Sequence, residues 1–460
     1  MGGTRKKSPD LCKKKMNFQE CELAILRQAV DNGQEKAKMK VANSDDVKKM
    51  IIIVEDFLKK TKCVCYGGTA INNILPEKSQ FYNKEIDIPD YDFFSKTPLK
   101  HAKQLADLYY KEGYTEVEAK AGMHYGTYKV FVNFIPMADI TLLHPALFKS
   151  ISNDAIVINN IRYTPPNFLR MSMYLELSRP NGDISRWEKV LKRLTSLNEH
   201  YPLKVQQCEL FDFQRPLESN KNENEAEEIY DIIKDFFIDQ NVVFFGGYAT
   251  SLYSEYMEGK KKRISKEIPD FDVLTNDVDR CTSALKQVLE ENGFKKIKIV
   301  KHKKIGEIIP AHHEVIVDGE TVAFVYATIA CHNYNEITIN KKKVRVATID
   351  TILSFYLAFL YSDYNHFSYF KERFLCIAQY LFEIEENNRL SQNGLLKRFS
   401  MDCEGVQPTI ETIRTEKSEM YEKLKNKKGN DAEKEAWFLK YNPAEKKNNK
   451  TKKKQNLRKI

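Results

Sequence analysis

The chain has 460 residues, of which 42% are hydrophobic, 11% aromatic and 30% charged. This is ordinary globular composition and excludes a wholly disordered, collagen-like or coiled-coil protein; the length predicts about two to four domains. The longest apolar stretch, residues 352–361, is about half of the ~20 residues that a transmembrane helix needs. The first residues lack the apolar core of a signal peptide. We therefore expect no membrane span and a protein of the cytosol or nucleus.

Positive charge is concentrated at the two ends of the chain. The net charge is +9, from 73 Lys and Arg against 64 Asp and Glu. Lys and Arg are dense in residues 1–15 and 446–459, and such segments attract polyanions without recognising their sequence. From about residue 430 the tail is too polar to bury much apolar surface, so we expect it to be disordered when free.

Nine cysteines are scattered along the chain, at positions 12, 21, 63, 65, 208, 281, 331, 376 and 403. An odd number without paired Cys-x-x-Cys spacing predicts neither a disulfide framework nor a zinc site. Cys63 and Cys65 lie two residues apart in an apolar run. We expect these two to be buried, reduced thiols on one face of a strand.

One succession of motifs occurs twice. An apolar run, a Gly-Gly pair and a helical pattern occupy residues 63–71 and recur at 243–250. The string Ile-Pro-Asp-aromatic-Asp follows at 88–92 and again at 268–272. Repetition of both motif and spacing predicts two copies of one structural unit in tandem.

Each copy continues with the same expected elements: a helix that ends at a capping glycine, an apolar strand, a strand with a central arginine, and a second helix. In the first copy these are 99–112, 130–140, the strand around Arg162, and 167–177. In the second copy they are 277–292, 322–330, the strand around Arg345, and 351–361. The predicted fold class is therefore α+β, with two mixed sheets and flanking helices.

We place four segments along the chain. A helical segment with a basic start covers residues 1–45, with its helix over Asn17–Asp31. The two α+β units cover 46–200 and 201–400, and a polar basic extension covers 401–460.

Three acidic residues of the first copy predict a metal site. Asp90 and Asp92 lie two apart on an expected strand, so their side chains point to the same face. Asp139 ends a different apolar strand, which could pair with the first. Converging carboxylates without His or Cys suit one or two Mg²⁺ (or Mn²⁺) ions that also bind substrate phosphates. Asp87 lies on the other face and is left out.

A glycine pair of the first copy predicts a phosphate site. Gly67, Gly68 and Thr69 connect an apolar strand to a helix. Backbone amides freed by the glycines and the positive end of the helix suit a triphosphate, and the Thr69 hydroxyl adds a donor. The basic residues Arg170, Lys189 and Arg193 follow in sequence and could bind the same phosphates; the alternative is a solvated helix face.

The second copy lacks part of this pattern. It keeps Asp270 and Asp272, but we align Ile329 with the third acid, and Tyr248 takes the place of the hydroxyl-bearing threonine. Since two metal ions need the third ligand, we expect this copy to be inert and to serve as a structural partner or an RNA-holding surface.

The motifs resemble the nucleotidyltransferase superfamily that includes DNA polymerase beta, and within it the poly(A) polymerase catalytic subunits of poxviruses and giant DNA viruses. The resembling stretches are 67–72, 89–94, 138–140, 165–170 and 186–193. The resemblance covers roughly residues 50–390, because that family carries a second, degenerate transferase-like domain. It implies template-independent addition of AMP from ATP to the 3′ end of messenger RNA, with Asp90, Asp92 and Asp139 as the metal ligands.

The resemblance also implies partners and a location. The substrates would be ATP and an RNA 3′ end, and the chain would pair with itself or with a separate processivity subunit. The place would be the host cytoplasm, in the viral factory, or the virion. Two alternatives stay open: another template-independent transferase, such as a CCA-adding enzyme or an oligonucleotide cyclase, and a non-catalytic RNA-binding scaffold.

Overall fold

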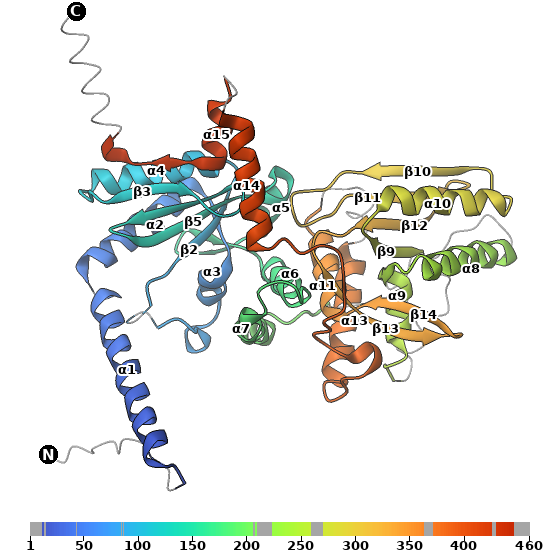
Figure 1. Ribbon diagram of the computed structural model, residues 1–460, viewed down its shortest axis with the longest axis horizontal. Helices are drawn as coiled ribbons and strands as arrows, with labels where there is room; N and C mark the ends of the chain where they lie inside the picture. The colour runs from blue at the N-terminus through green and yellow to red at the C-terminus, as the bar shows by residue number, and fades with distance from the viewer. Residues whose placement is uncertain are drawn as a thin grey trace, which may run out of the picture.

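The computed structural model describes residues 12, 15–42, 44–83, 85, 87–205, 208, 223–258, 270–362, 371–425 and 429–445. These residues form two units, each built on a mixed eight-stranded sheet with helices packed against it (Figure 1). The α+β fold class with a tandem repeat is thus confirmed. Within the described residues no helix has both the length and the apolar character of a membrane span.

The first unit contains the first copy of the glycine and acidic motifs. In spatial order its strands are β16 (Lys440–Tyr441), β3 (Val117–Ala121), β4 (Thr127–Val132), β5 (Ile135–Leu142), β2 (Tyr91–Ser95), β1 (Val64–Cys65), β7 (Ile161–Tyr163) and β6 (Ile156–Ile158). Its helices are α2 (Asp45–Thr61), α3 (Gly67–Ile74), α4 (Pro98–Lys111), α5 (Pro145–Asn153), α6 (Pro166–Leu177) and α7 (Trp187–His200).

The second unit repeats this arrangement. Its strands, in spatial order, are β10 (Ile297–His302), β11 (His312–Val317), β12 (Glu320–Ala327), β9 (Phe271–Thr275), β8 (Val243–Phe245), β14 (Lys342–Ala347), β13 (His332–Ile339) and β15 (Cys403–Glu404). Its helices are α8 (Glu223–Asp239), α9 (Gly246–Ser254), α10 (Val278–Glu291), α11 (Ile349–Phe359) and α13 (Lys371–Asn387). In both units the strand with the acidic motif lies parallel to the strand that ends the following hairpin.

Local sequence signals define several helix ends. The Ser44 hydroxyl accepts a hydrogen bond from the Val47 amide at the start of α2, which satisfies one of the free N–H groups of the first turn. Helices α4 and α10 are followed by Gly113 and Gly293, with φ of 100° and 95°. This left-handed conformation costs a glycine little, so the expected capping glycines are confirmed.

Residues 130–140 do not form one strand, as the sequence suggested, but a hairpin of β4 and β5. The chain reverses at Asn133 and Phe134, whose φ angles are 49° and 66°. Two consecutive residues with positive φ make the kind of turn whose twist suits a tight hairpin. The apolar run hid this turn, because neither residue is a glycine. As a result, Lys129 of β4 lies directly opposite Asp139 of β5.

The two units are joined through equivalent helices. Helix α6 of the first unit packs on α11 of the second, with the rings of Phe168 and Tyr361 edge to face, 5.1 Å apart. The Asn333 amide at the start of β13 donates to the Ser178 carbonyl at 2.9 Å. One hydrophobic cluster extends through both units, so their relative position rests on burial of apolar surface.

The C-terminal part of the chain connects the two sheets. β15 adds an edge strand to the second sheet, and the chain then runs through α14 (Ile410–Lys425) and α15 (Asp431–Phe438) to β16 on the edge of the first sheet (Figure 1). Trp437 packs on Tyr125 with ring centroids 4.5 Å apart, and Leu439 is buried. The expected disorder from residue 430 is therefore wrong for residues 429–445, whose few apolar side chains find a surface to cover. Residues 446–460 lie outside the described part.

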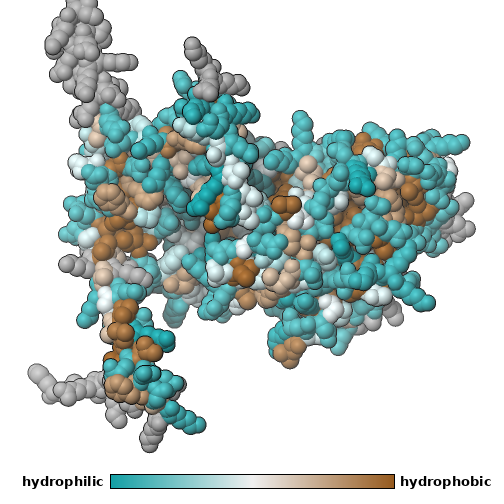
Figure 2. Space-filling model, in the orientation of Figure 1, coloured by the Kyte–Doolittle hydropathy of each residue, from teal (hydrophilic) through white to brown (hydrophobic). Residues whose placement is uncertain are grey.

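The helix near the N-terminus is longer than predicted. α1 spans Phe18–Ala42, against the expected Asn17–Asp31, and it projects from the first unit (Figure 1). Its exposed large apolar side chains include Phe18, Leu23, Leu26 and Val30. Figure 2 shows apolar surface on this helix.

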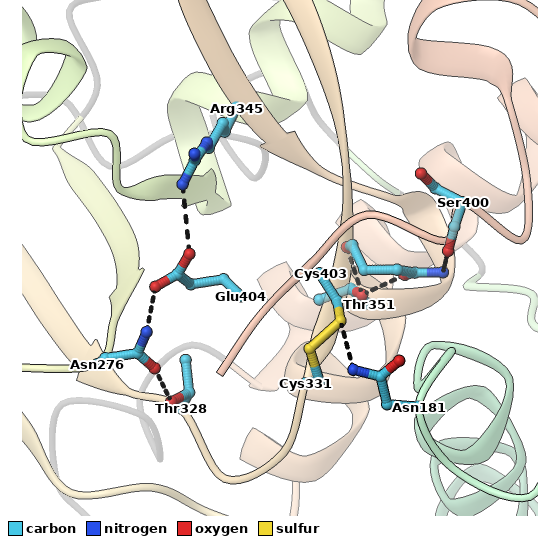
Figure 3. Close-up of a disulfide and its surroundings, with 10 residues drawn as sticks. Asn181, Asn276, Thr328, Cys331, Arg345, Thr351, Ser400, Cys403 and Glu404 are labelled. Atoms are coloured by element: carbon cyan, nitrogen blue, oxygen red, sulfur yellow. Dashed lines mark hydrogen bonds and ion pairs between the residues drawn. A yellow bond between two sulfur atoms is a disulfide. The ribbon is translucent and has the colours of Figure 1, made fainter. Parts of the chain in front are cut away.

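Three disulfides correct the expectation from cysteine spacing. Cys12–Cys21, Cys208–Cys376 and Cys331–Cys403 are bonded. Two of them join residues 168 and 72 positions apart, which a rule about neighbouring cysteines cannot detect. Figure 3 shows Cys331–Cys403 fastening β15 beside β13, with Glu404 held by Arg345 and Asn276. Cys63 and Cys65 are free and buried, as expected.

Candidate active site

The strand register brings two of the three predicted carboxylates side by side. Asp92 of β2 lies directly opposite Asp139 of β5, and the two strands are parallel. Parallel neighbours at the same register point to the same face of a sheet, with about 4.8 Å between the strands. Asp90 immediately precedes β2, and its influence on the pKa of Asp92 shows that its carboxylate is close to that of Asp92.

The electrostatics of these carboxylates show that they affect one another. Burial, then Asp90 and Asp139, raise the pKa of Asp92 to about 7, and Lys129 and Arg186 oppose the rise. Burial and Asp139 also raise the pKa of Asp90, against Lys129. Ionising all of them at neutral pH therefore requires additional positive charge.

Asp139 has one paired and one orphaned oxygen. Its Oδ2 forms an ion pair with the Lys129 ammonium group. Its Oδ1 is buried and accepts no hydrogen bond from any residue that the structure describes. A buried carboxylate oxygen without a partner is costly, and a hard divalent cation would satisfy it. The donor chemistry thus fits Mg²⁺, although within the described ranges no three His, Cys, Asp or Glu side chains are already grouped as metal ligands.

Gly67 lies against the carboxylate of Asp92. Its φ is 71°, and a Cβ there would come within 2.6 Å of Asp92 Oδ2, so only glycine fits. The Tyr66 amide donates to the Asp92 carbonyl at 2.9 Å. The Thr69 hydroxyl donates to the Asp90 carbonyl at 2.7 Å. The hydroxyl predicted to contact a triphosphate thus connects the start of α3 to the acidic strand.

Gly68 allows a basic side chain to approach the start of α3. A Cβ on this residue would lie 2.4 Å from Tyr82 Oη and 2.9 Å from Arg193 Nη1. Arg193 Nη2 donates to Tyr82 Oη at 2.9 Å, and the guanidinium lies 4.8 Å from the ring centroid of Phe81. The predicted glycine pair and the predicted arginine are therefore neighbours.

Two further basic groups of α7 and the turn before it lie close by. The positive charge of Arg193 is the largest cause that lowers the pKa of Lys189, followed by burial and Arg186. Arg186 pairs with Glu176 at 3.1 Å and also lowers the pKa of Asp92. The predicted Lys189 and Arg193 thus belong to one positive cluster beside the carboxylates.

Arg170 does not belong to that cluster. It is 1% exposed, and its Nε donates to Asn198 Oδ1 at 2.6 Å. Its two terminal nitrogens donate to Asn167 Oδ1 and to the Tyr201 carbonyl. All three guanidinium nitrogens have protein partners, so the placement contradicts the predicted contact with a nucleotide. The sequence did not show that the side chain of Arg170 points from α6 into the interior of the protein.

Sequence reasoning missed three residues of the site, namely Lys129, Arg186 and Tyr82. Lys129 would have been found only by recognising the hairpin turn, because its partner lies ten residues away across it. Arg186 begins the stretch 186–193, which resembles the viral poly(A) polymerase family. The pattern of basic residues on the expected helix did not assign Arg186 a role in the site. Tyr82 lies in a segment without regular periodicity, where no local signal places a side chain.

The second unit preserves the framework of the site but lacks an acid at the position equivalent to Asp139. A Cβ on Gly246 would lie 2.1 Å from Asp272 Oδ2, which repeats the contact of Gly67 in the first unit. The residue opposite Asp272, however, is Phe324, and not Ile329 as aligned from the sequence. Tyr248 is buried and packs on the Phe244 ring at 4.9 Å. A hydrophobic side chain thus stands where the third acid would be.

The fold and this arrangement define the chain as nucleotidyltransferase-like in structure. The crystal structure of the Megavirus polyadenylate synthase superposes with a TM-score of 0.77, over 96% of this chain and 89% of that one, at 19% identity. At this identity the likeness shows the fold alone.

Sequence comparisons are more specific. A family model described as poly(A) polymerase catalytic subunit matches residues 52–183. A protein of Acanthamoeba polyphaga mimivirus named "Putative poly(A) polymerase catalytic subunit" is 30% identical over 41% of this chain and 31% of its own length. One of the same name from African swine fever virus (strain Badajoz 1971 Vero-adapted) is 29% identical over 37% and 36%. The chain thus spans about a third of the length of these curated relatives. The expected resemblance to viral poly(A) polymerase catalytic subunits is confirmed.

Proposed function

We propose that this chain is a polynucleotide adenylyltransferase that adds AMP from ATP to RNA 3′ ends without a template. The observation that carries the proposal is the pairing of Asp92 with Asp139 across β2 and β5, next to the glycine pair at the start of α3. Carboxylates beside a helix N-terminus suit a reaction in which a hydroxyl attacks a nucleoside triphosphate. The matched family supports the choice of ATP and RNA.

The chain's own groups account for binding and orientation. The N–H groups of the first turn of α3 lack partners within the helix and would donate to phosphate oxygens of ATP. The guanidinium of Arg193, which lies against Gly68, would neutralise charge that develops on the leaving pyrophosphate, assisted by Lys189. The Asp139 carboxylate would accept the proton of the RNA 3′-hydroxyl as the hydroxyl oxygen bonds to the α-phosphorus and the bond to pyrophosphate breaks.

Asp90, Asp92 and Asp139 would hold the divalent cation, Mg²⁺ or Mn²⁺. When bound, such an ion neutralises phosphate charge and lowers the pKa of the attacking hydroxyl. The raised pKa of Asp92 supports this assignment, because crowded carboxylates are held together at neutral pH by a cation.

The wider setting follows from the relatives and is part of the proposal. The similar proteins are viral, which favours messenger RNA as the substrate and the host cytoplasm or the virion as the place of action. The partner would be a second copy of the chain or a separate processivity subunit, as the word subunit in the relatives' names indicates.

Product analysis tests the reaction. The protein is incubated with a short labelled RNA, Mg²⁺ and each NTP separately, and the products are resolved on a gel. The expected result is a long ladder with ATP alone. Incorporation of CTP, or cyclic products without RNA extension, would instead indicate one of the alternative transferases. No nucleotide incorporation with any NTP, together with intact RNA binding, would indicate a scaffold.

Matched variants then test the site. Replacing Asp90 and Asp92 together by Ala should abolish extension. The same pair of changes in the second unit, Asp270→Ala and Asp272→Ala, should leave it. Thermal unfolding of both double variants shows whether either is misfolded. Full extension by the first double variant would refute the site assignment.

A further inference from the structure

A basic pocket lies in the first unit, at the end of β2 opposite to the end that carries Asp90 and Asp92. It has a volume of about 490 Å³ and is lined by side chains from the ends of α2, β2 and α5, the start of α4, and β7. Four of them are cationic: Lys62, Lys96, Lys149 and Arg162. Its lining contains no Asp or Glu. We call this site the basic pocket.

Within the described part of the chain, the four cations of the basic pocket lack acidic partners, and their only aromatic contact is Lys96 Nζ over the Phe148 ring, 5.1 Å from its centroid. The hydroxyl oxygen of Ser152, at the end of α5, is buried and makes no hydrogen bond to a described residue. Four unpaired positive charges and a free hydroxyl donor favour an anionic ligand.

The helix ends at the pocket do not cancel this charge. Helices α2 and α5 end here, and each C-terminus carries about half a negative charge. Helix α4 begins here with about half a positive charge, after Thr97, whose side chain makes no capping hydrogen bond. The remaining negative contribution is therefore small beside four full positive charges.

The basic pocket is separate from the catalytic carboxylates. Asp92 lies near the start of β2, level with the Tyr66 amide, whereas Lys96 follows the last residue of β2. Four residues of extended chain span roughly 13 Å. One phosphate group cannot contact both places, but a polynucleotide can.

We propose that the basic pocket binds a phosphodiester group of RNA upstream of the 3′ end that reacts. This inference rests on the proposed function, which supplies RNA as the substrate. Cations contributed by several elements suit backbone contact that does not depend on sequence. Such contact holds the RNA while its 3′ end advances by one nucleotide in each cycle.

RNA binding by the full chain tests the pocket without using catalysis. The double variant Lys96→Ala, Lys149→Ala removes two exposed charges from the pocket, and Lys295→Ala, Lys298→Ala removes two exposed charges from the second unit. Affinity for a labelled single-stranded RNA is measured by fluorescence anisotropy over a range of salt, without ATP or metal. Loss of two phosphate contacts lowers the salt slope by about 1.4 and the affinity about tenfold near 0.15 M salt. The control variant should match the wild type.

Three outcomes would overturn the inference. An equal loss in the control variant would mean that overall charge, and not the pocket, attracts RNA. A lower melting temperature with unchanged RNA affinity would mean that the lysines only stabilise helix ends. Loss of thermal stabilisation by inorganic phosphate, again with unchanged RNA affinity, would assign the pocket to free phosphate. The binding assay contains no ATP, so it is independent of catalysis. If RNA binds through the pocket but the separate extension assay shows no product, the proposed function is refuted and the pocket assignment is kept.

Discussion

Lys129 and Glu314 occupy the same place in the two units. Lys129 lies opposite Asp139 in the β4–β5 hairpin, and Glu314 lies opposite Phe324 in the β11–β12 hairpin. The first pair combines a cation with an acid, and the second combines an acid with an aromatic ring. The two units therefore share a backbone framework and differ at the position where the proposed reaction needs a third carboxylate.

This difference predicts unequal effects of substitution. Asp139→Asn removes the charge that we assign to the cation and to the 3′-hydroxyl, so the rate of AMP addition should fall by about 10²–10³-fold or more. Phe324→Leu, at the equivalent position of the second unit, should leave the rate unchanged and cost about 1 kcal/mol of stability. Single-turnover extension and urea unfolding measure the two effects. Comparable activity of both variants would contradict the assignment.

The glycine pair predicts a specific effect on ATP binding. Gly68→Ala places a methyl group 2.4 Å from Tyr82 Oη, so the tyrosine and Arg193 must move and the KM for ATP should rise. Gly33→Ala in α1 meets no atom within 4 Å and should stabilise the helix by about 0.5–1 kcal/mol without changing KM. Steady-state kinetics with ATP as the varied substrate separates the two, and an unchanged KM in Gly68→Ala would contradict the placement.

Arg170 and Arg193 should respond differently to substitution. Arg170→Met leaves three partly buried acceptors without a donor and should lower the free energy of unfolding by about 1–3 kcal/mol. Arg193→Ala should raise the KM for ATP with a much smaller effect on stability, because its side chain is partly exposed. Chemical unfolding and KM, measured on both, test this division. A large rise in KM with unchanged stability in Arg170→Met would restore it as a nucleotide ligand.

A buried charge cluster in the second unit predicts how stability depends on pH. Arg398 pairs with Asp350 at 2.6 Å and with Glu385. Burial, then Asp350, raise the pKa of Glu385 from 4.5 to about 8, against the opposing effect of Arg398. The folded state thus holds this proton more tightly than the unfolded state. The stability that the group contributes is complete below pH 4.5 and is lost as the pH rises to about 8.

The variant Glu385→Gln should remove the loss of folding stability that accompanies ionisation of Glu385 as the pH rises. Relative to the wild type, its free energy of unfolding should increase steadily from pH 5 to pH 8, as measured by urea unfolding at each pH. Glu386→Gln changes the exposed neighbour and should show no such trend. A parallel pH dependence in Glu385→Gln and the wild type would show that the carboxyl is ionised throughout.

Much of the fold could be predicted because its signals are local. The capping glycines after α4 and α10, the Gly-Gly starts of α3 and α9, and the repeated acidic motif each depend on backbone conformation over a few residues. Their repetition at matching spacing was enough to predict two related α+β units. Alternation along a strand likewise predicted a shared face for Asp90 and Asp92, of which the structure places only Asp92 within β2.

What residue patterns could not supply were the contacts between distant segments. The turn at Asn133 and Phe134 brings Lys129 to Asp139. The packing of α6 places Arg170 in the interior, although nothing in the sequence distinguishes it from an exposed basic residue. The disulfide between Cys331 and Cys403 and the return of residues 440–441 to the first sheet depend on the completed fold. Such contacts are chosen by burial and shape among many alternatives, so tertiary packing decided them, whereas backbone preference had already set the motifs.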